Sequence, residues 1–315
     1  MQNKIHSLIR VLMLLICLTI LVTSCAQQDN KENLSTNDTN TPSVTTQAET
    51  TPPEWAPKDE WELLREKATT RGIKVLFIGN SLTYYNDMPE LFENLCILDG
   101  KIVDAERLTY AGQNIAMMKD DETMWSEIDT KLTSRAWDVV VFQTDRNGVV
   151  MEEYFPDYPL KVYEAAKELT EKIRDAGAIP VIYSTFGVNK GSLTFQDHTK
   201  ENITSVELSN LVIAYDAAVA QKLNCKVVYA GATFNSVLSS NPEINLFHTD
   251  ERHPSLAGSV LIACDFYTVL FGQSPENIRF KGGLDSEETA AVLRKAAAGL
   301  LTYTPRTIAT INGAD

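Results

Sequence analysis

Several features that would indicate particular functions are missing from this chain. No stretch is rich in lysine or arginine, and the formal net charge is −14 over 315 residues, so we do not expect a nucleic-acid partner. No glycine-rich loop has the spacing that cradles nucleotide phosphates. The five cysteines lack the spacing of a metal site. We therefore expect neither a metal ion nor another cofactor.

The longest apolar run is too short to cross a membrane. It covers residues 11–22 and follows a basic lead with Lys4 and Arg10, whereas a transmembrane helix needs roughly 20 apolar residues. This pattern is typical of a signal peptide. The run ends in Val-Thr-Ser-Cys at Cys25, which resembles a bacterial lipobox and implies removal of residues 1–24 and lipidation of Cys25. The alternative is an ordinary signal peptide with a chance cysteine.

Residues 25–58 are mostly polar and include four prolines. Such a segment buries too little apolar surface to offset the entropy lost on ordering. We expect a disordered tether that holds a domain of residues 59–315 at a bacterial membrane, outside the cytoplasm. The acidic net charge does not favour docking on anionic lipid headgroups, so the lipid would provide the anchor.

Three cysteines lie within the expected domain. Cys96 and Cys264 have apolar neighbours, which predicts buried free thiols. One disulfide among Cys96, Cys225 and Cys264 stays open at this point, because an extracytoplasmic setting permits one.

Short apolar runs alternate with segments of helical period from about residue 55 onward. Candidate strands cover residues 74–78, 102–108, 138–142, 179–183 and 226–229. Candidate helices cover residues 60–69, 158–176, 206–222 and 255–271. The alternation predicts an α/β fold, a three-layer α/β/α sandwich around a parallel sheet of about five strands. The run at 102–108 is more polar, so we expect it at an edge. Loops at 84–87, 147–157 and 184–205 would surround a site at the carboxyl ends of the strands.

Ser81 directly follows the first candidate strand, within Gly79-Asn80-Ser81. A serine at a sharp strand exit can present its hydroxyl to a cleft, with backbone N–H groups near a developing oxyanion. Taken alone, this is also an ordinary turn. Gly112 follows the second strand and can offer an unhindered N–H group. Gln143 and Asn147 follow the third strand and carry amide donors.

Histidine is scarce in the expected domain, with only His198, His248 and His253. Asp250 precedes His253 by three residues, so its carboxylate can hold one ring nitrogen and leave the other free as a base. The alternative is a loop with ordinary surface charges. His248 lacks this spacing, and His198 has only Asp197 beside it.

The order of these blocks resembles the SGNH (GDSL-like) hydrolases, between about Lys74 and Phe271. Gly79-Asn80-Ser81 matches the nucleophile block, Gly112 the oxyanion glycine, and Asp250-x-x-His253 the last block. The usual Gly-x-Asn-Asp of the third block is absent. Gln143 and Asn147 instead match the Gln-Gly-Glu-x-Asn spacing of some SGNH carbohydrate esterases.

This resemblance implies a flavodoxin-like fold in a largely uncharacterised bacterial branch. It implies Ser81, Asp250 and His253 as catalytic residues, and an oxyanion hole formed by Ser81, Gly112 and Gln143, with Asn147 as second choice. The expected function is a serine esterase that removes O-acetyl groups from carbohydrate at the cell surface. Polar and aromatic residues beside Ser81 and in the 184–205 loop favour a sugar. The alternatives are a lipase or thioesterase acting on acyl chains, and a glycan-binding surface lipoprotein without activity.

We predict that the mature protein begins at a lipidated Cys25, because the apolar run stops at the cysteine. Intact mass spectrometry of the membrane-extracted protein should show the loss of residues 1–24 and the added mass of acyl chains. A chain that is cleaved elsewhere and carries an unmodified Cys25 would contradict this prediction.

Overall fold

The computed structural model describes residues 58–314. The expected signal peptide, Cys25 and the tether up to residue 57 lie outside the described residues. The strands are β1 (Ile73–Gly79), β2 (Val103–Thr109), β3 (Val139–Gln143), β4 (Ile179–Ser184), β5 (Ser192–Phe195), β6 (His198–Glu201) and β7 (Lys226–Tyr229). The helices are α2 (Glu60–Thr70), α3 (Ser81–Tyr84), α4 (Met88–Leu98), α5 (Ile115–Asp120), α6 (Glu122–Thr133), α7 (Tyr158–Asp175), α8 (Ser205–Leu223), α9 (Ala230–Ser240), α10 (Leu256–Phe271) and α11 (Glu287–Ala298).

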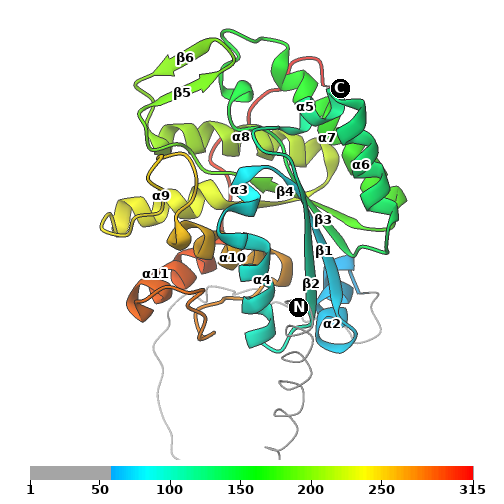
Figure 1. The fold of residues 1–315 in the computed structure, drawn as a ribbon, viewed down its shortest axis with the longest axis vertical. Coiled ribbons are helices and arrows are strands. Elements are labelled where there is room, and N and C mark those ends of the chain that lie inside the picture. Colours follow the sequence, from blue (N-terminus) through cyan, green and yellow to red (C-terminus); the bar gives the residue numbers. More distant parts are fainter. Residues whose placement is uncertain (1–57, 315) are drawn as a thin grey trace, which may run out of the picture. The chain divides into compact units, whose positions relative to one another are not determined.

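Five parallel strands form the central sheet, in the order β2-β1-β3-β4-β7. This is the flavodoxin-like order, in which the chain reverses its direction of travel across the sheet after the second strand. The predicted α/β/α sandwich is confirmed, and the more polar run at 102–108 lies at an edge as expected (Figure 1).

Alternate residues of the central strands enter two separate hydrophobic cores. On β1, Val75 and Phe77 belong to one core, whereas Leu76 and Ile78 belong to the other. All four side chains are buried. A parallel sheet covered on both faces needs apolar residues at every position, which explains why the strands read as continuous apolar runs.

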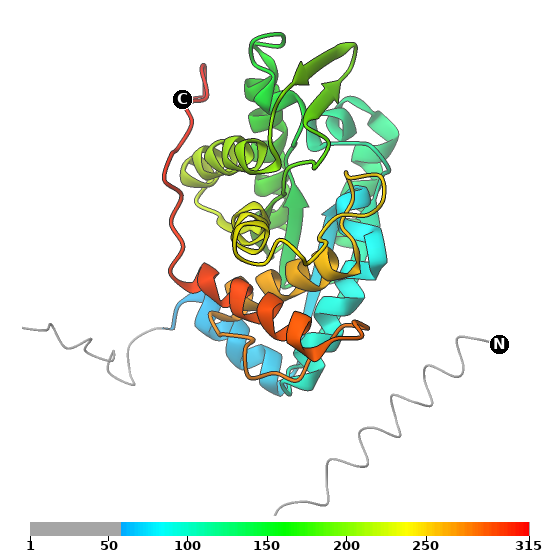
Figure 2. The same cartoon turned by 90° about the vertical axis from the view of Figure 1, so that its left-hand side faces the viewer.

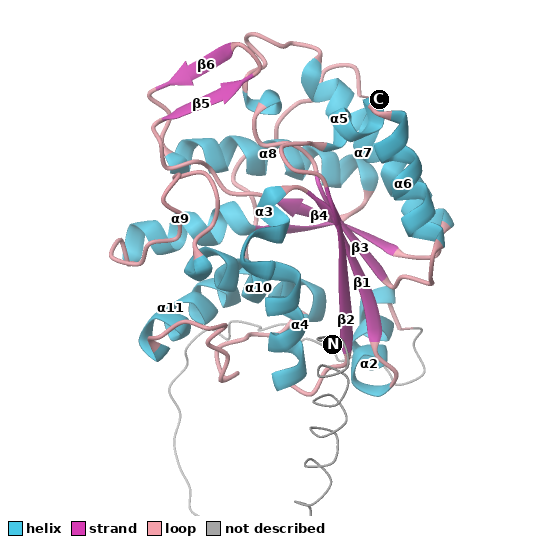
Figure 3. Cartoon of the chain, viewed as in Figure 1, coloured by secondary structure: helices cyan, strands magenta, loops and turns pink. Residues whose placement is uncertain are grey.

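Helices cover both faces of the sheet, as Figure 3 shows. Residues of α2, α4, α9, α10 and α11 form the first core, and residues of α5, α6, α7 and α8 form the second. Helix α10 is almost wholly buried because it packs against α4 and α11 as well as β7. Within residues 58–314, no helix combines the length and apolar character needed to span a bilayer.

The C-terminal segment crosses from α11 to the opposite layer of helices (Figure 2). The Ala309 N–H donates to the Ala214 carbonyl of α8 at 2.9 Å, and Ile311 is buried in the second core. Lys222 Nζ donates to the carbonyl of Ala314. The segment therefore contributes to the hydrophobic core on the α8 side.

A short antiparallel hairpin, β5–β6, occupies part of the 184–205 segment, for which the sequence predicted no regular element. Each strand has only four residues, too few for alternation to be read as a strand. Leu193 and Phe195 point into the second core and hold the hairpin there.

The three cysteines of the described part are free thiols, with Cys96 and Cys264 buried and Cys225 half-buried. The free-thiol prediction for Cys96 and Cys264 is confirmed, and the disulfide that the sequence left open is not formed among the three. Burial raises the pKa of each thiol, which suits inert core positions rather than reactive ones.

A buried carboxyl group on α8 supports the strand ends. Asp216 is fully buried, and its Oδ1 accepts a hydrogen bond of 2.5 Å from Thr144 Oγ1, just beyond β3. Burial raises the pKa of Asp216 from its usual 3.8 to about 7. The native state therefore keeps this proton over a pH range in which the unfolded chain loses it.

We predict that Asp216 makes the protein less stable as the pH rises from about 4 to 7. The native state binds more protons than the unfolded state in that window, so the free energy of unfolding falls with rising pH. In Asp216→Asn this loss is absent, and the two chains should diverge by up to about 4 kcal/mol at pH 7. Urea unfolding at unit pH steps measures the difference. A difference that does not change with pH would count against a protonated Asp216.

Candidate active site

Ser81 is the first residue of α3, directly beyond the carboxyl end of β1. Asn80 caps this short helix, since its Oδ1 accepts from the Leu82 N–H at 3.0 Å. A Cβ on Gly79 would lie 2.1 Å from Gln143 Oε1. A side chain at this position would displace Gln143 or Thr83 from the Ser81 turn. The Asn80 cap then turns the chain so that Ser81 lines a cleft.

Asn80 also connects the turns that follow three neighbouring strands. Its Nδ2 donates to the Gln113 carbonyl after β2 at 2.8 Å, and its backbone N–H donates to Gln143 Oε1 at the end of β3 at 2.9 Å. Thr83 Oγ1 donates to the same Oε1 at 2.5 Å. These bonds hold the chain around Ser81 from two sides.

Gln143 is buried and turns its carbonyl oxygen to the Ser81 turn. Its Nε2 makes one contact of 3.3 Å with Asn80 Oδ1. An amide nitrogen carries two hydrogens, so one remains for another acceptor. The side chain thus braces the turn, and its predicted role as an oxyanion donor stays a prediction.

The loop that carries His253 is closed by its own hydrogen bonds. The His248 N–H donates to the His253 carbonyl at 2.8 Å. Asp250 Oδ1 accepts from the backbone N–H groups of Arg252 and His253 at 2.9 and 3.0 Å. The backbone therefore orients the carboxylate and leaves Oδ2 for the imidazole ring.

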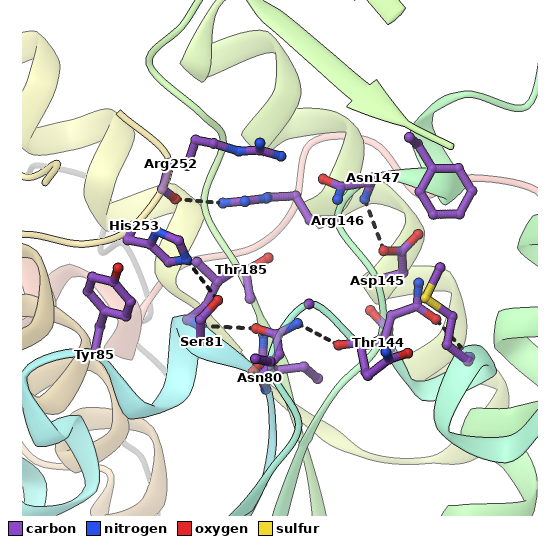
Figure 4. A pocket seen from close by; sticks show the side chains of 18 of the residues that line it. Asn80, Ser81, Tyr85, Thr144, Asp145, Arg146, Asn147, Thr185, Arg252 and His253 are labelled. Atoms are coloured by element: carbon purple, nitrogen blue, oxygen red, sulfur yellow. Dashed lines mark hydrogen bonds between the residues drawn. The ribbon is translucent and has the colours of Figure 1, made fainter. Parts of the chain in front are cut away.

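Ser81, His253 and Asp250 meet in a continuous chain of hydrogen bonds, part of which Figure 4 shows. His253 Nδ1 lies 2.6 Å from Asp250 Oδ2, and His253 Nε2 lies 2.8 Å from Ser81 Oγ. Burial alone would raise the pKa of Asp250, but hydrogen bonds from the His253 ring and the two backbone N–H groups outweigh it, and the pKa lies well below its usual range. The carboxylate is charged and can stabilise a protonated imidazole.

A tyrosine that sequence reasoning did not assign to catalysis fixes the plane of the His253 ring. Tyr85 stacks on His253 with ring centroids 4.1 Å apart and an interplanar angle of 2°. The His248 ring meets Tyr85 edge-on, is half exposed, and lies 3.8 Å from Asp250 Oδ2. His198 lies on β6 and pairs with Asp197. The structure thus brings His253 to Ser81, while His248 and His198 have no hydrogen bond to it.

Two backbone N–H groups near Ser81 are available to a ligand. The N–H groups of Ser81 and Gly112 make no hydrogen bond within residues 58–314, and both residues line the cleft. Gly112 has φ +72°, a backbone conformation that residues other than glycine rarely adopt. Pre-oriented N–H groups beside a nucleophile are the usual elements of an oxyanion hole.

Asp145 organises the loop after β3. Its carboxylate accepts from the backbone N–H groups of Asn147, Gly148 and Val149. Asn147 lines the cleft, and its Oδ1 is buried without a hydrogen-bond partner in the described part of the chain. This oxygen can accept a hydrogen bond from a ligand, whereas an oxyanion needs a donor such as Nδ2, so the role of Asn147 as second choice for the oxyanion stays a prediction.

The cleft has a volume of about 730 Å³, and most of the residues that line it are polar or charged. Amide, hydroxyl and charged side chains line it together with aromatic rings, and aliphatic side chains are few. The β5–β6 hairpin supplies one wall through Thr194, Phe195 and Gln196. Among residues 58–314, no three His, Cys, Asp or Glu side chains cluster as a metal site would need.

No protein-family model and no curated protein matches the chain. Solved structures do match. A protein from Slackia heliotrinireducens, described as a candidate SGNH hydrolase, aligns with a TM-score of 0.51 at 23% identity, over 64% of this chain and 100% of that one. A DUF4886 family protein from Bacteroides uniformis aligns with a TM-score of 0.60 at 14% identity, over 76% of this chain and 98% of that one. The chain therefore has an SGNH-like fold, as the sequence resemblance implied.

We predict that a fluorophosphonate will modify Ser81. A general base contributes about 10²- to 10⁴-fold to such a step, so His253→Ala should slow labelling by at least about 100-fold, and His248→Ala should leave the rate within about threefold. Peptide mass spectrometry locates the adduct, and Ser81→Ala is the blank. Rapid labelling of His253→Ala, or loss of labelling in His248→Ala, would assign the base to another residue.

Proposed function

We propose that the chain is a serine esterase that removes O-acetyl groups from carbohydrate. The observation that carries this proposal is the hydrogen-bonded chain from Ser81 Oγ through His253 to Asp250, at 2.8 and 2.6 Å. A glycan-binding protein without activity has no need of all three groups in this geometry.

The reaction follows from that geometry. His253 Nε2 takes the Ser81 proton while Oγ attacks the ester carbonyl, and the imidazolium then gives the proton to the leaving sugar oxygen. Asp250 holds the ring and balances its positive charge. His253 then deprotonates a water molecule, which attacks the acyl-serine. The imidazolium returns this proton to Ser81 Oγ as its bond to the acyl carbon breaks and acetate is released. Each of these steps uses groups that the chain itself supplies.

The backbone N–H groups of Ser81 and Gly112 would bind the tetrahedral oxyanion, with Gln143 as third donor and Asn147 as second choice. Loss of one such donor costs roughly 2.7–4 kcal/mol in the barrier. Gln143 would use the Nε2 hydrogen that Asn80 does not take.

The lining of the cleft supports acetylated carbohydrate over long acyl chains. Apolar chains bind in grooves that are lined mainly by apolar side chains, whereas this cleft is rich in amide, hydroxyl and charged groups. Tyr84, Tyr85 and Phe195 provide aromatic surface beside those polar groups, a combination that suits the faces and hydroxyls of sugars. Lipid anchoring through Cys25 would place the enzyme on polymers outside the cell.

We predict that kcat/KM falls at least tenfold from p-nitrophenyl acetate to p-nitrophenyl octanoate, because the polar cleft does not stabilise the longer chain. Ser81→Ala and His253→Ala should each nearly abolish turnover, and the double variant should be little worse, because the residues act as a unit. His248→Ala is the matched control and should stay within about tenfold of wild type, roughly 1.4 kcal/mol.

The p-nitrophenyl esters, together with a binding and acetate-release assay on acetylated glycans, separate the alternative functions. Octanoate as the better substrate would favour a lipase or thioesterase. Binding of acetylated glycans without release of acetate, and with no ester turned over, would leave a glycan-binding protein.

A further inference from the structure

Two arginine side chains in the cleft have no carboxylate partner. Arg146 and Arg252 both line the cleft beside His253, and neither forms an ion pair within residues 58–314. The two acidic residues of the cleft are already engaged, Asp145 by backbone N–H groups and Asp250 by His253. Positive charge is thus concentrated at this point of a chain whose net charge is −14.

Arg146 is held rigidly but incompletely satisfied. Its Nη1 donates to the carbonyls of Phe186 and Arg252 at 3.3 and 3.2 Å, while its Nε is buried without a partner. Burial, and then the charge of Arg252, lower the pKa of Arg146 to about 10. A buried donor without an acceptor destabilises the empty cleft, and a bound anion would remove that penalty.

The partners of another buried arginine differ from those of Arg146 and Arg252. Arg294 of α11 is buried, and it donates to Glu287 at 2.6 Å and to the Phe280 carbonyl at 2.6 Å. A carboxylate therefore accompanies the guanidinium group of Arg294. Arg146 and Arg252 lack that partner, and Figure 4 shows Arg252 extending from the His253 loop and Arg146 reaching towards that loop from the opposite wall.

We infer that Arg146 and Arg252 form a subsite for a carboxylate of the substrate, so that the acetylated carbohydrate is an acidic sugar. Guanidinium groups bind carboxylates through paired hydrogen bonds, more strongly than neutral donors do. The subsite rests on the proposed esterase function for its place in catalysis. Its arginines lie outside the Ser81–His253–Asp250 chain, so it can be removed separately.

The test compares acetate release from an acetylated methyl glucuronoside with release from its methyl ester, which lacks only the charge. For the full chain, kcat/KM should favour the free acid. Arg252→Gln should lower the ratio of acid to ester at least tenfold, because only the free acid carries the charge that the Arg252 guanidinium would bind. Arg252→Lys should recover part of the ratio. Arg279→Gln, an exposed arginine outside the cleft, is the matched control and should leave it unchanged.

Two further measurements separate the sources of the carboxylate and the two proposals. The first compares kcat/KM for p-nitrophenyl hemiglutarate, which carries its charge on the acyl group, with kcat/KM for p-nitrophenyl butyrate. If Arg252→Gln changes this ratio and not the ratio for the two glucuronosides, the inference of an acidic sugar is overturned. Calorimetric titration of Ser81→Ala with both glucuronosides reports binding without turnover. If acetate is released from both glucuronosides and Arg252→Gln does not change the ratio of acid to methyl ester, the subsite is rejected and the esterase is kept. Arg252-dependent binding of the acid without any hydrolysis keeps the subsite and rejects the esterase.

Discussion

The hydrogen bonds of Asn80 hold together the ends of the first three strands of the chain. One residue donates from its side chain to the Gln113 carbonyl and from its backbone to Gln143, and it caps the helix that begins with Ser81. These bonds connect the segments that follow β1, β2 and β3. The position of the Ser81 hydroxyl therefore depends on how these strands pack together.

The carboxylates and the guanidinium groups of the cleft differ in the partners that the protein gives them. Each carboxylate near Ser81 is held by groups of the protein, either backbone N–H groups or an imidazole. Within residues 58–314, the hydrogen bonds of the Arg146 guanidinium go only to carbonyl oxygens, and the Arg252 guanidinium has none. Tyr85 shields one face of the His253 ring. The result is an imidazole ring with a defined orientation beside Ser81, in a cleft whose uncompensated charge is positive.

The sequence by itself determined the five central strands, four of the helices, and the candidate site residues that a local pattern marks. The five central strands and the helices at 60–69, 158–176, 206–222 and 255–271 could be read because burial on one or both faces imposes a period on the residues of each element. Asp250 and His253 could be paired because three residues form one turn. Ser81 and Gly112 could be selected because each follows a strand, and a resemblance to a known family supported their order along the chain.

The tertiary structure alone decided which distant groups meet. The sequence could identify Gln143 as an amide near the site. Its hydrogen bond to Asn80, however, depends on β1 and β3 being neighbours, which no local pattern encodes. Tyr85 meets His253 only because the segments after β1 and α9 converge, and Arg146 contacts Arg252 across 106 residues of sequence. Periodicity reports whether a residue is buried. Partners across the sheet depend on strand order and register, and these are set by the packing of the complete domain.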